Sequence, residues 1–260
     1  MKINEWMQKI EERFPLDAAE EWDNPGLLAG WADREARRIF VALDVTEETL
    51  REALDFRADL MITHHPLIFG GIRAVSDADH VGRRLLAMIE QGISYYAMHT
   101  NFDVVAMGEI NARQLQLRDD AVLGITGERD GIPEGIGRVG MLPREMTLRE
   151  LATFVREQME LPEVRVYGDP DAPMKKAAVS GGSGKSMVAD ALRSGADVLI
   201  SSDLDYHNAI DAVADGLCYI DAGHYGTEYG FIGYMTRFLS GLAPDCAIAG
   251  AATRHPFFVS

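Results

Sequence analysis

The sequence predicts an α/β protein built from two layered α-β-α halves with mostly parallel strands. Short apolar segments, typical of buried strands, alternate along the chain with amphipathic segments at helical spacing. The alternation starts again after a stretch rich in glycine and charge at 127–137. We therefore expect a first half at 1–126 and a second half at 127–260, with an approximate boundary and with C-terminal elements that can pack on the first half.

The first predicted element is an amphipathic helix at 3–14, in which apolar residues recur at helical spacing between glutamates. A structured loop follows at 20–30. The expected strands lie at 39–45, 59–65, 94–100, 121–125, 137–142, 176–180, 197–201, 217–221 and 245–250. The expected helices lie between them, at 46–56, 81–92, 106–116, 147–160, 185–194, 206–215 and 227–241. Thr46 is a candidate N-cap, and Thr147 with Glu150 forms a capping box.

The composition is that of a soluble globular protein. The 260 residues are 47% hydrophobic and 25% charged, with a formal net charge of -16. This acidity argues against nucleic acid or an anionic membrane as a partner. The chain has only 2 cysteines and no apolar run that approaches the length of a membrane span, and its first helix does not have the continuous apolar block of a signal peptide. We expect a cytoplasmic protein.

Polar side chains gather where three of the expected strands end, which is where ligands bind in α/β sheets. They are His64 and His65, then His99, Asn101 and Asp103, and finally Asp221, His224 and Glu228. Imidazole and carboxylate groups together suit divalent zinc, iron, manganese, cobalt or nickel. The sequence therefore predicts a metal site in the cleft at the carboxyl ends of the strands.

Two adjacent histidines on a strand point in opposite directions, so His64 and His65 fit two ions better than one. A carboxylate has two oxygens and can bridge such a pair, and Asp103 and Glu228 are the candidates. His224 and Glu228 are four residues apart and share a face if that segment is helical.

Several other polar residues have a structural and a functional interpretation. For His99 we favour proton transfer or support of a ligand over direct metal binding, and His207 is a weaker candidate of the same kind. Asp44 can simply cap the following helix, and Glu21 and Asp23 can serve catalysis or only the loop. His80 and His255 are interpreted as surface or core residues.

The segment SGGSGKS (180–186) resembles a phosphate-binding P-loop, because it follows a strand and opens a helix. The full pattern requires glycine at the position of Val179. An anion can still bind at such a helix N-terminus. We keep a P-loop-like nucleotide-binding protein as the least favoured alternative.

Taken together, these stretches resemble the GTP cyclohydrolase 1 type 2 homologue family, also described as NGG-interacting-factor-like metal-binding proteins. The matching segments span nearly the whole chain, in family order: EEWDNPGLL (20–28), ALDVT (42–46), ITHHPLIF (62–69), HTNFD (99–103), SGGSG (180–184) and DAGHYGTE (221–228). One departure is Pro25, where the family pattern has valine. At 260 residues there is no room for the domain that many members carry mid-chain, so the resemblance implies the short form.

The resemblance implies a two-part α/β fold, a ring-shaped homohexamer and a dinuclear site with two divalent ions per subunit. The family's ligands correspond to His64, His65, Asp103, His224 and Glu228. The apolar tail residues Phe257, Phe258 and Val259 agree with burial within the chain or against a neighbouring subunit.

The function we expect is that of a metal-dependent hydrolase, in which a metal-bridged hydroxide attacks a small molecule of unknown identity. His99 or Glu21 would transfer protons. The family name implies GTP as substrate, although no motif in the chain recognises guanine. The alternative is a non-catalytic metal-binding protein with a regulatory or scaffold role.

Overall fold

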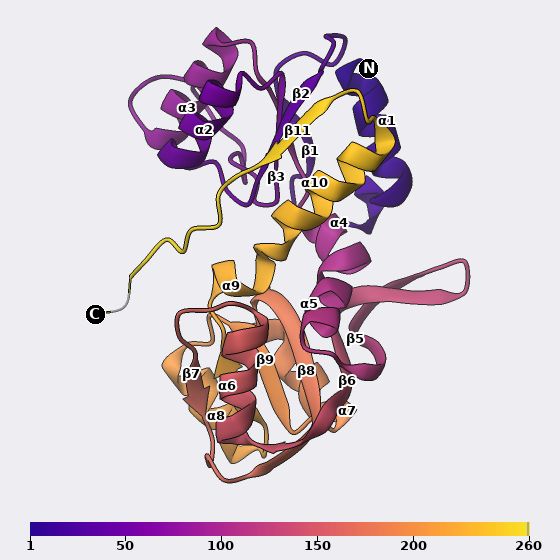
Figure 1. The fold of residues 1–260 in the computed structure, drawn as a ribbon, viewed down its shortest axis with the longest axis vertical. Coiled ribbons are helices and arrows are strands. Elements are labelled where there is room, and N and C mark those ends of the chain that lie inside the picture. Colours follow the sequence, from indigo (N-terminus) through magenta and orange to yellow (C-terminus); the bar gives the residue numbers. More distant parts are fainter. Residues whose placement is uncertain (259) are drawn as a thin grey trace. The chain divides into compact units, whose positions relative to one another are not determined.

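The computed structural model describes residues 1–258 and 260, and Val259 lies outside the described residues. It divides into two compact units (Figure 1). Unit 1 comprises Met1–Phe102 and Phe231–Thr253, and unit 2 comprises Asp103–Gly230 and Arg254–Ser260. The boundary expected at 126–127 instead falls inside a strand of unit 2. The C-terminal strand and most of the helix before it belong to unit 1, as the sequence left open.

Unit 1 contains a five-stranded sheet in the order β1-β4-β3-β2-β11. Its strands are β1 (Gly26–Ala29), β2 (Arg38–Ala42), β3 (Leu60–Thr63), β4 (Ser94–Ala97) and β11 (Ala247–Gly250). Every neighbouring pair is parallel except β1 and β4. Strands β3 and β4 are buried along their whole length, which explains their apolar sequences.

Helices cover both faces of this sheet. They are α1 (Ile3–Arg13), α2 (Glu47–Phe56), α3 (His80–Glu90), the short α4 (Thr100–Phe102) and α10 (Gly230–Leu242), with a 3₁₀ turn at Leu16–Ala18. Figure 1 shows α2 and α3 on one side of the strands and α1 and α10 on the other. The Thr46 hydroxyl accepts a hydrogen bond from the Thr49 N–H, so Thr46 caps α2 as expected.

Unit 2 contains a six-stranded sheet in the order β5-β6-β8-β9-β10-β7. Its strands are β5 (Arg118–Arg129), β6 (Ile132–Thr147), β7 (Arg165–Tyr167), β8 (Pro173–Ser183), β9 (Val198–Ser202) and β10 (Cys218–Asp221). Only β8–β9 and β9–β10 are parallel pairs, so the expectation of mostly parallel strands is wrong for this sheet. The α/β class itself is confirmed.

The stretch at 127–137, which the sequence analysis placed between the two halves, is the end of a long hairpin between β5 and β6. Asp130 and Gly131 both have positive φ angles, of 54° and 78°, and they connect the paired residues Arg129 and Ile132. This is the two-residue turn that Asp-Gly favours between antiparallel strands. The Asp-Gly dipeptide itself indicates a hairpin turn. The residues on either side are rich in charge and glycine, so they do not show the apolar pattern from which strands are predicted.

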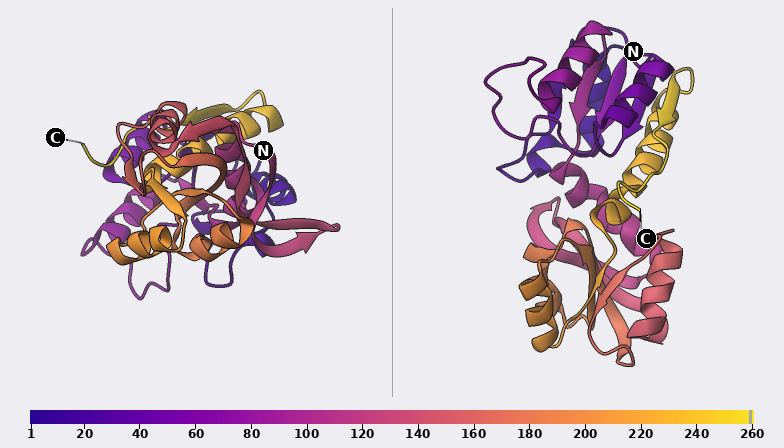
Figure 2. Two further views of the ribbon diagram at one scale, coloured as in Figure 1. Left: turned by 90° about the horizontal axis from the view of Figure 1, so that it is seen from below. Right: turned by 90° about the vertical axis from the view of Figure 1, so that its left-hand side faces the viewer.

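The sheet of unit 2 is covered on both faces, as Figure 2 shows. Helix α6 (Leu148–Gln158) contributes to one apolar cluster, and α7 (Val188–Ser194) and α8 (Tyr206–Ala214) contribute to the other. A π-helix (Asp103–Met107), α5 (Gly108–Gln114), a 3₁₀ turn (Lys185–Met187) and α9 (His224–Glu228) complete the unit. Within the described residues, no helix is both long enough and apolar enough to cross a bilayer.

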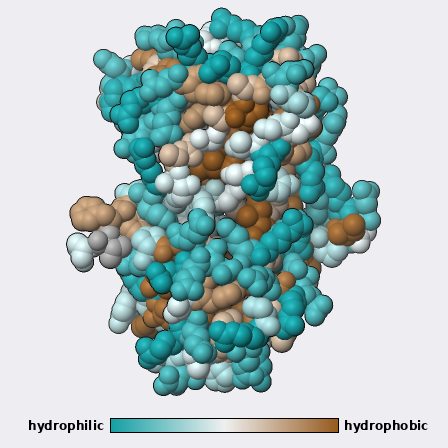
Figure 3. All heavy atoms as spheres, viewed as in Figure 1, coloured by the Kyte–Doolittle hydropathy of each residue, from teal (hydrophilic) through white to brown (hydrophobic). Residues whose placement is uncertain are grey.

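The C-terminal tail is assigned to unit 2 and is more open than expected. Phe258 is 88% exposed and Phe257 is 48% exposed. Burial of Phe258 within the chain is therefore ruled out, whereas burial against a neighbouring subunit stays a prediction. In Figure 3, apolar surface appears in patches among hydrophilic residues on the face that is drawn.

Candidate metal centre

Three histidines meet at one edge of the sheet in unit 1. His64 and His65 directly follow β3, and His99 follows β4 by one residue. The two strands are parallel neighbours with Thr63 opposite Ala97, so the residues that follow them lie at the same edge. One ring nitrogen from each histidine lies within 4.8 Å of those of the other two. This spacing is small enough for the three rings to share metal ions.

The two adjacent histidines are each oriented through Nδ1. His64 is completely buried, and its Nδ1 lies 2.8 Å from the carbonyl oxygen of Met98. The Nδ1 of His65 lies 2.8 Å from Oδ1 of Asp44. An oxygen acceptor at Nδ1 keeps the proton there and leaves the Nε2 lone pair to bind a metal. Asp44 therefore contacts His65, while the cap of α2 is Thr46.

His99 is held in the same way by a carboxylate in the loop after α1. Its Nδ1 lies 2.8 Å from Oδ1 of Asp23, whose side chain is completely buried. The Thr100 N–H donates to Oδ2 of the same carboxylate at 2.9 Å. Burial raises the pKa of Asp23, but the hydrogen bonds from His99 and Thr100 outweigh it and lower the pKa to about 2. Asp23 thus stays ionised and fixes the ring, while Glu21 is exposed in the same loop.

A buried tyrosine holds the loop that carries the paired histidines. The Tyr95 hydroxyl lies 2.7 Å from the Thr63 hydroxyl, donates to the His65 carbonyl oxygen at 3.0 Å and accepts from the Leu67 N–H at 2.8 Å. Burial raises the pKa of Tyr95 to about 12, so the hydroxyl remains neutral and can donate. Sequence reasoning missed this role, because the apolar pattern of β4 marks Tyr95 only as a core residue.

Unit 2 carries a second set of donors. His224 and Glu228 are one turn apart on α9, with Nε2 of His224 3.2 Å from Oε2 of Glu228. The Nδ1 of His224 lies 2.5 Å from Oδ2 of Asp203, so this histidine is also oriented by a carboxylate. Asp103 begins the π-helix at the start of the unit. Glu228 is only 3% exposed, and a carboxylate this deeply buried depends on close polar or cationic partners such as His224.

The segment SGGSGKS lies against this second set of donors. Gly182 has a φ of +58°, and a Cβ atom there would lie 2.4 Å from Oε1 of Glu228 and 3.3 Å from Nε2 of His224. The Gly182 N–H donates to the Thr227 hydroxyl at 3.0 Å. Gly182 therefore makes room for Glu228 and His224. This role was not predicted from the sequence, where the segment was compared with a phosphate-binding loop.

The features of a phosphate-binding loop are weak in the same segment. Residues 180–183 belong to β8, and the 3₁₀ turn that follows is only 3 residues long. Lys185 forms an exposed ion pair with Asp205 at 3.3 Å. Because Gly182 faces the carboxylate of Glu228, a phosphate at the glycines would meet negative charge.

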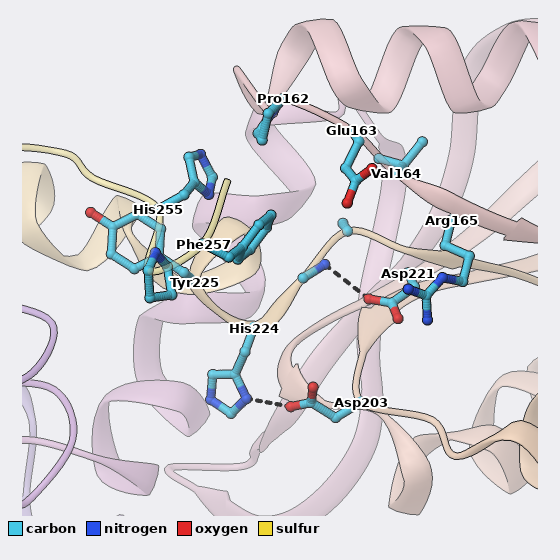
Figure 4. Close-up of a pocket in the computed structure, with 13 residues that line it drawn as sticks. Pro162, Glu163, Val164, Arg165, Asp203, Asp221, His224, Tyr225, His255 and Phe257 are labelled. Atoms are coloured by element: carbon cyan, nitrogen blue, oxygen red, sulfur yellow. Dashed lines mark hydrogen bonds and ion pairs between the residues drawn. The ribbon is translucent and has the colours of Figure 1, made fainter. Parts of the chain in front are cut away.

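Beside His224 there is a pocket of about 360 Å³, which also includes Asp203 and Asp221 (Figure 4). Asp221 is half-buried, and burial raises the pKa of its carboxyl group against the lowering effect of a hydrogen bond from the Gly223 N–H. His255 lines this pocket, whereas the sequence predicted only a surface or core residue at that position.

The donor chemistry of both sets fits a borderline divalent cation. Each set supplies imidazole, unit 2 adds two carboxylates, and each of the four histidines has an oxygen acceptor at Nδ1. Nitrogen and oxygen donors of this kind suit zinc, iron, manganese, cobalt and nickel. Both units therefore contain side chains that can hold metal ions.

Comparison with known proteins agrees with the fold and with these motifs. Residues 1–253 match the model of Duf34/NIF3 (NGG1p interacting factor 3). The GTP cyclohydrolase 1 type 2 homolog of Clostridium perfringens is 34% identical over 238 residues, covering 88% of this chain and 87% of the relative. A solved Staphylococcus aureus protein has a TM-score of 0.90 at 28% identity and covers 100% of this chain and 99% of its own.

A Bacillus cereus protein related to NIF3 has a TM-score of 0.92, again with 100% of this chain and 99% of the other chain covered. Because the two sequences are only 24% identical, this structural similarity supports the fold alone. The family model covers almost the entire chain and includes every motif on which the resemblance rested. The protein belongs to the Duf34/NIF3 family.

Proposed function

We propose that this protein binds two divalent metal ions per chain and hydrolyses a small molecule with their help. The proposed ligands are His64, His65, Asp103, His224 and Glu228. The observation that carries the proposal is the common orientation of the histidines. Each has an oxygen acceptor at Nδ1, which favours the tautomer whose Nε2 lone pair can bind a metal. Surface or core histidines have no need for such uniform support.

The order of the chain supports joint use of the two donor sets. Asp103 follows Phe102, the last residue of the first segment of unit 1, and Glu228 precedes Phe231 by three residues. Both carboxylates are thus next in sequence to the unit that carries the paired histidines. Asp103 and Glu228 would each supply a carboxylate to the metal centre, and their negative charge would offset the repulsion between two cations.

Two other side chains, His99 and Glu21, would transfer protons during hydrolysis. Divalent ions supply Lewis acidity, which makes water nucleophilic near neutral pH and stabilises an oxyanion. His99 can take up a proton at Nε2, because Asp23 keeps the other proton on Nδ1 and stabilises the imidazolium that forms. Glu21, exposed in the same loop, is the second proposed group for proton transfer.

The test is a substrate screen with nucleotides, pterins and phosphoesters. GTP is included because the names of the relatives mention it. We expect one class to be hydrolysed, the activity to disappear with a chelator and to return with added metal. The variant His99→Asn should keep its metal and lose most of the activity. If no compound shows chelator-sensitive turnover, the protein is a metal-binding regulator or scaffold instead.

We propose a homohexamer as the assembled form. The exposed Phe257 and Phe258 at the tail support contact with another subunit. Light scattering should give about six times the chain mass, and a monomeric mass would rule the assembly out. We also propose a cytoplasmic location, in agreement with the free thiols of Cys218 and Cys246.

A further inference from the structure

The pocket beside His224 lies entirely within unit 2 and has two chemically different walls. Figure 4 shows Glu163, Arg165 and Asp221 on one side and Tyr225, His255 and Phe257 on the other. His224 and Asp203 lie at one end of it, so a molecule in the pocket would be next to a proposed metal ligand. A pocket with an apolar wall and a few converging polar groups is the usual form of a small-molecule site.

The polar wall presents a hydrogen-bond acceptor next to a donor. Arg165 on β7 and Asp221 on β10 are directly opposite each other in the antiparallel pair. Oδ1 of Asp221 accepts from the Gly223 N–H at 3.0 Å, which fixes the carboxylate. An ionised carboxylate only accepts hydrogen bonds and a guanidinium only donates them. The complementary ligand edge therefore has an N–H donor beside an acceptor atom.

The opposite wall is aromatic and is built by the C-terminal tail. The ring centroids of Tyr225 and His255 are 5.2 Å apart, and those of His255 and Phe257 are 5.7 Å apart. The Arg254 N–H donates to the Tyr225 hydroxyl at 3.0 Å, which ties the tail to α9. Such a wall favours a flat conjugated ligand, because ring stacking is the strongest contact that it can make.

We propose that this pocket binds a planar nitrogen heterocycle of the purine or pyrimidine type, with its ring against Phe257 and its edge on Asp221 and Arg165. The inference rests on the proposed function, because this heterocycle would be part of the substrate. The match to the Duf34/NIF3 model ends at residue 253, so residues 255–257 of the aromatic wall lie beyond it.

The test measures binding by calorimetry and does not depend on turnover. The probes are inosine, 1-methylinosine, which lacks the ring N–H, and ribose 5-phosphate, which lacks the ring. We expect inosine to bind, methylation to weaken it roughly tenfold or more, and ribose 5-phosphate to bind far more weakly. Asp221→Asn keeps an oxygen for the Gly223 N–H but offers the ligand a donor, so inosine should bind roughly tenfold to a hundredfold more weakly.

An exposed aromatic residue elsewhere in unit 2 provides a control for the aromatic wall. Phe257→Ala removes a lining ring and should weaken inosine roughly fivefold or more. Tyr206→Ala removes a ring that is 67% exposed and does not line the pocket, so it should leave inosine binding unchanged. Equal affinity for all three probes, or equal effects of the two variants, would overturn the proposal. Metal content is measured on the same samples: metal without inosine binding refutes only the pocket, and inosine binding without metal refutes only the proposed function.

Discussion

Replacing Gly182 with alanine tests whether the glycine segment makes room for the donors of unit 2. The new Cβ would lie 2.4 Å from Oε1 of Glu228, well under the 3.0 Å that real Cβ contacts respect. Glu228 is only 3% exposed and has little space to move without leaving its position. We expect metal affinity to fall about 10- to 100-fold, as when a group that positions a ligand is lost.

A second glycine separates this effect from backbone strain. Gly182 and Gly195 have φ angles of +58° and +70°, so alanine costs about 1 kcal/mol of stability at either position. A Cβ at Gly195 would meet no atom of the described residues within 4 Å. Gly195→Ala should therefore lower the melting temperature in a similar way and leave metal affinity unchanged.

The assay is metal content by mass spectrometry after dialysis against buffered free metal, with thermal unfolding of the metal-free proteins recorded in parallel. Only Gly182→Ala should lose metal. If both variants keep the same metal affinity, Glu228 and His224 do not bind metal at this place, and the reasoning is refuted.

Three further changes test other parts of the structure. Tyr95→Phe removes the hydroxyl that links Thr63, His65 and Leu67 and should lower the free energy of unfolding by about 1–3 kcal/mol, measured by urea denaturation; an unchanged midpoint would contradict it. Asp44→Ala should weaken metal binding about 10- to 100-fold and leave α2 intact by circular dichroism, because Thr46 caps that helix. Hydrogen bonds from Thr147 lower the pKa of Glu150, so its contribution to stability is present above its ordinary pKa of 4.5 and is lost as pH falls through the lowered value. Glu150→Gln should show a smaller drop in melting temperature between about pH 6 and about pH 3, and an identical pH profile would show that the charge contributes nothing.

The positions of the candidate donors could be predicted from the sequence because strand ends in α/β proteins converge. His64, His65 and His99 follow buried apolar strands, and parallel pairing brings such positions to one edge. His224 and Glu228 were predicted from their place after a strand and from their helical spacing, and the structure has both on α9. Local patterns of this kind need no knowledge of distant partners.

The groups that orient the donors could not be found in this way. Asp44 is two residues before an N-cap, and Asp23 lies in a loop, so both have adequate local explanations. Their contacts with His65 and His99 span 21 and 76 residues and depend on the packing of the whole unit. The role of Gly182 could not be predicted for the same reason. It lies against Glu228, which is 46 residues later in the chain, whereas the local sequence resembles a P-loop.

The most direct test of the proposed function is the number of metal ions bound per chain, with their ligand type from X-ray absorption. We predict two divalent ions with nitrogen and oxygen ligands. Asp103→Ala and Glu228→Ala should each lose metal from both positions, His64→Ala should mainly weaken one, and Lys185→Ala should leave the content unchanged. A single ion bound through sulfur, or a Lys185→Ala variant that loses nucleotide binding while Asp103→Ala keeps both ions, would contradict the account.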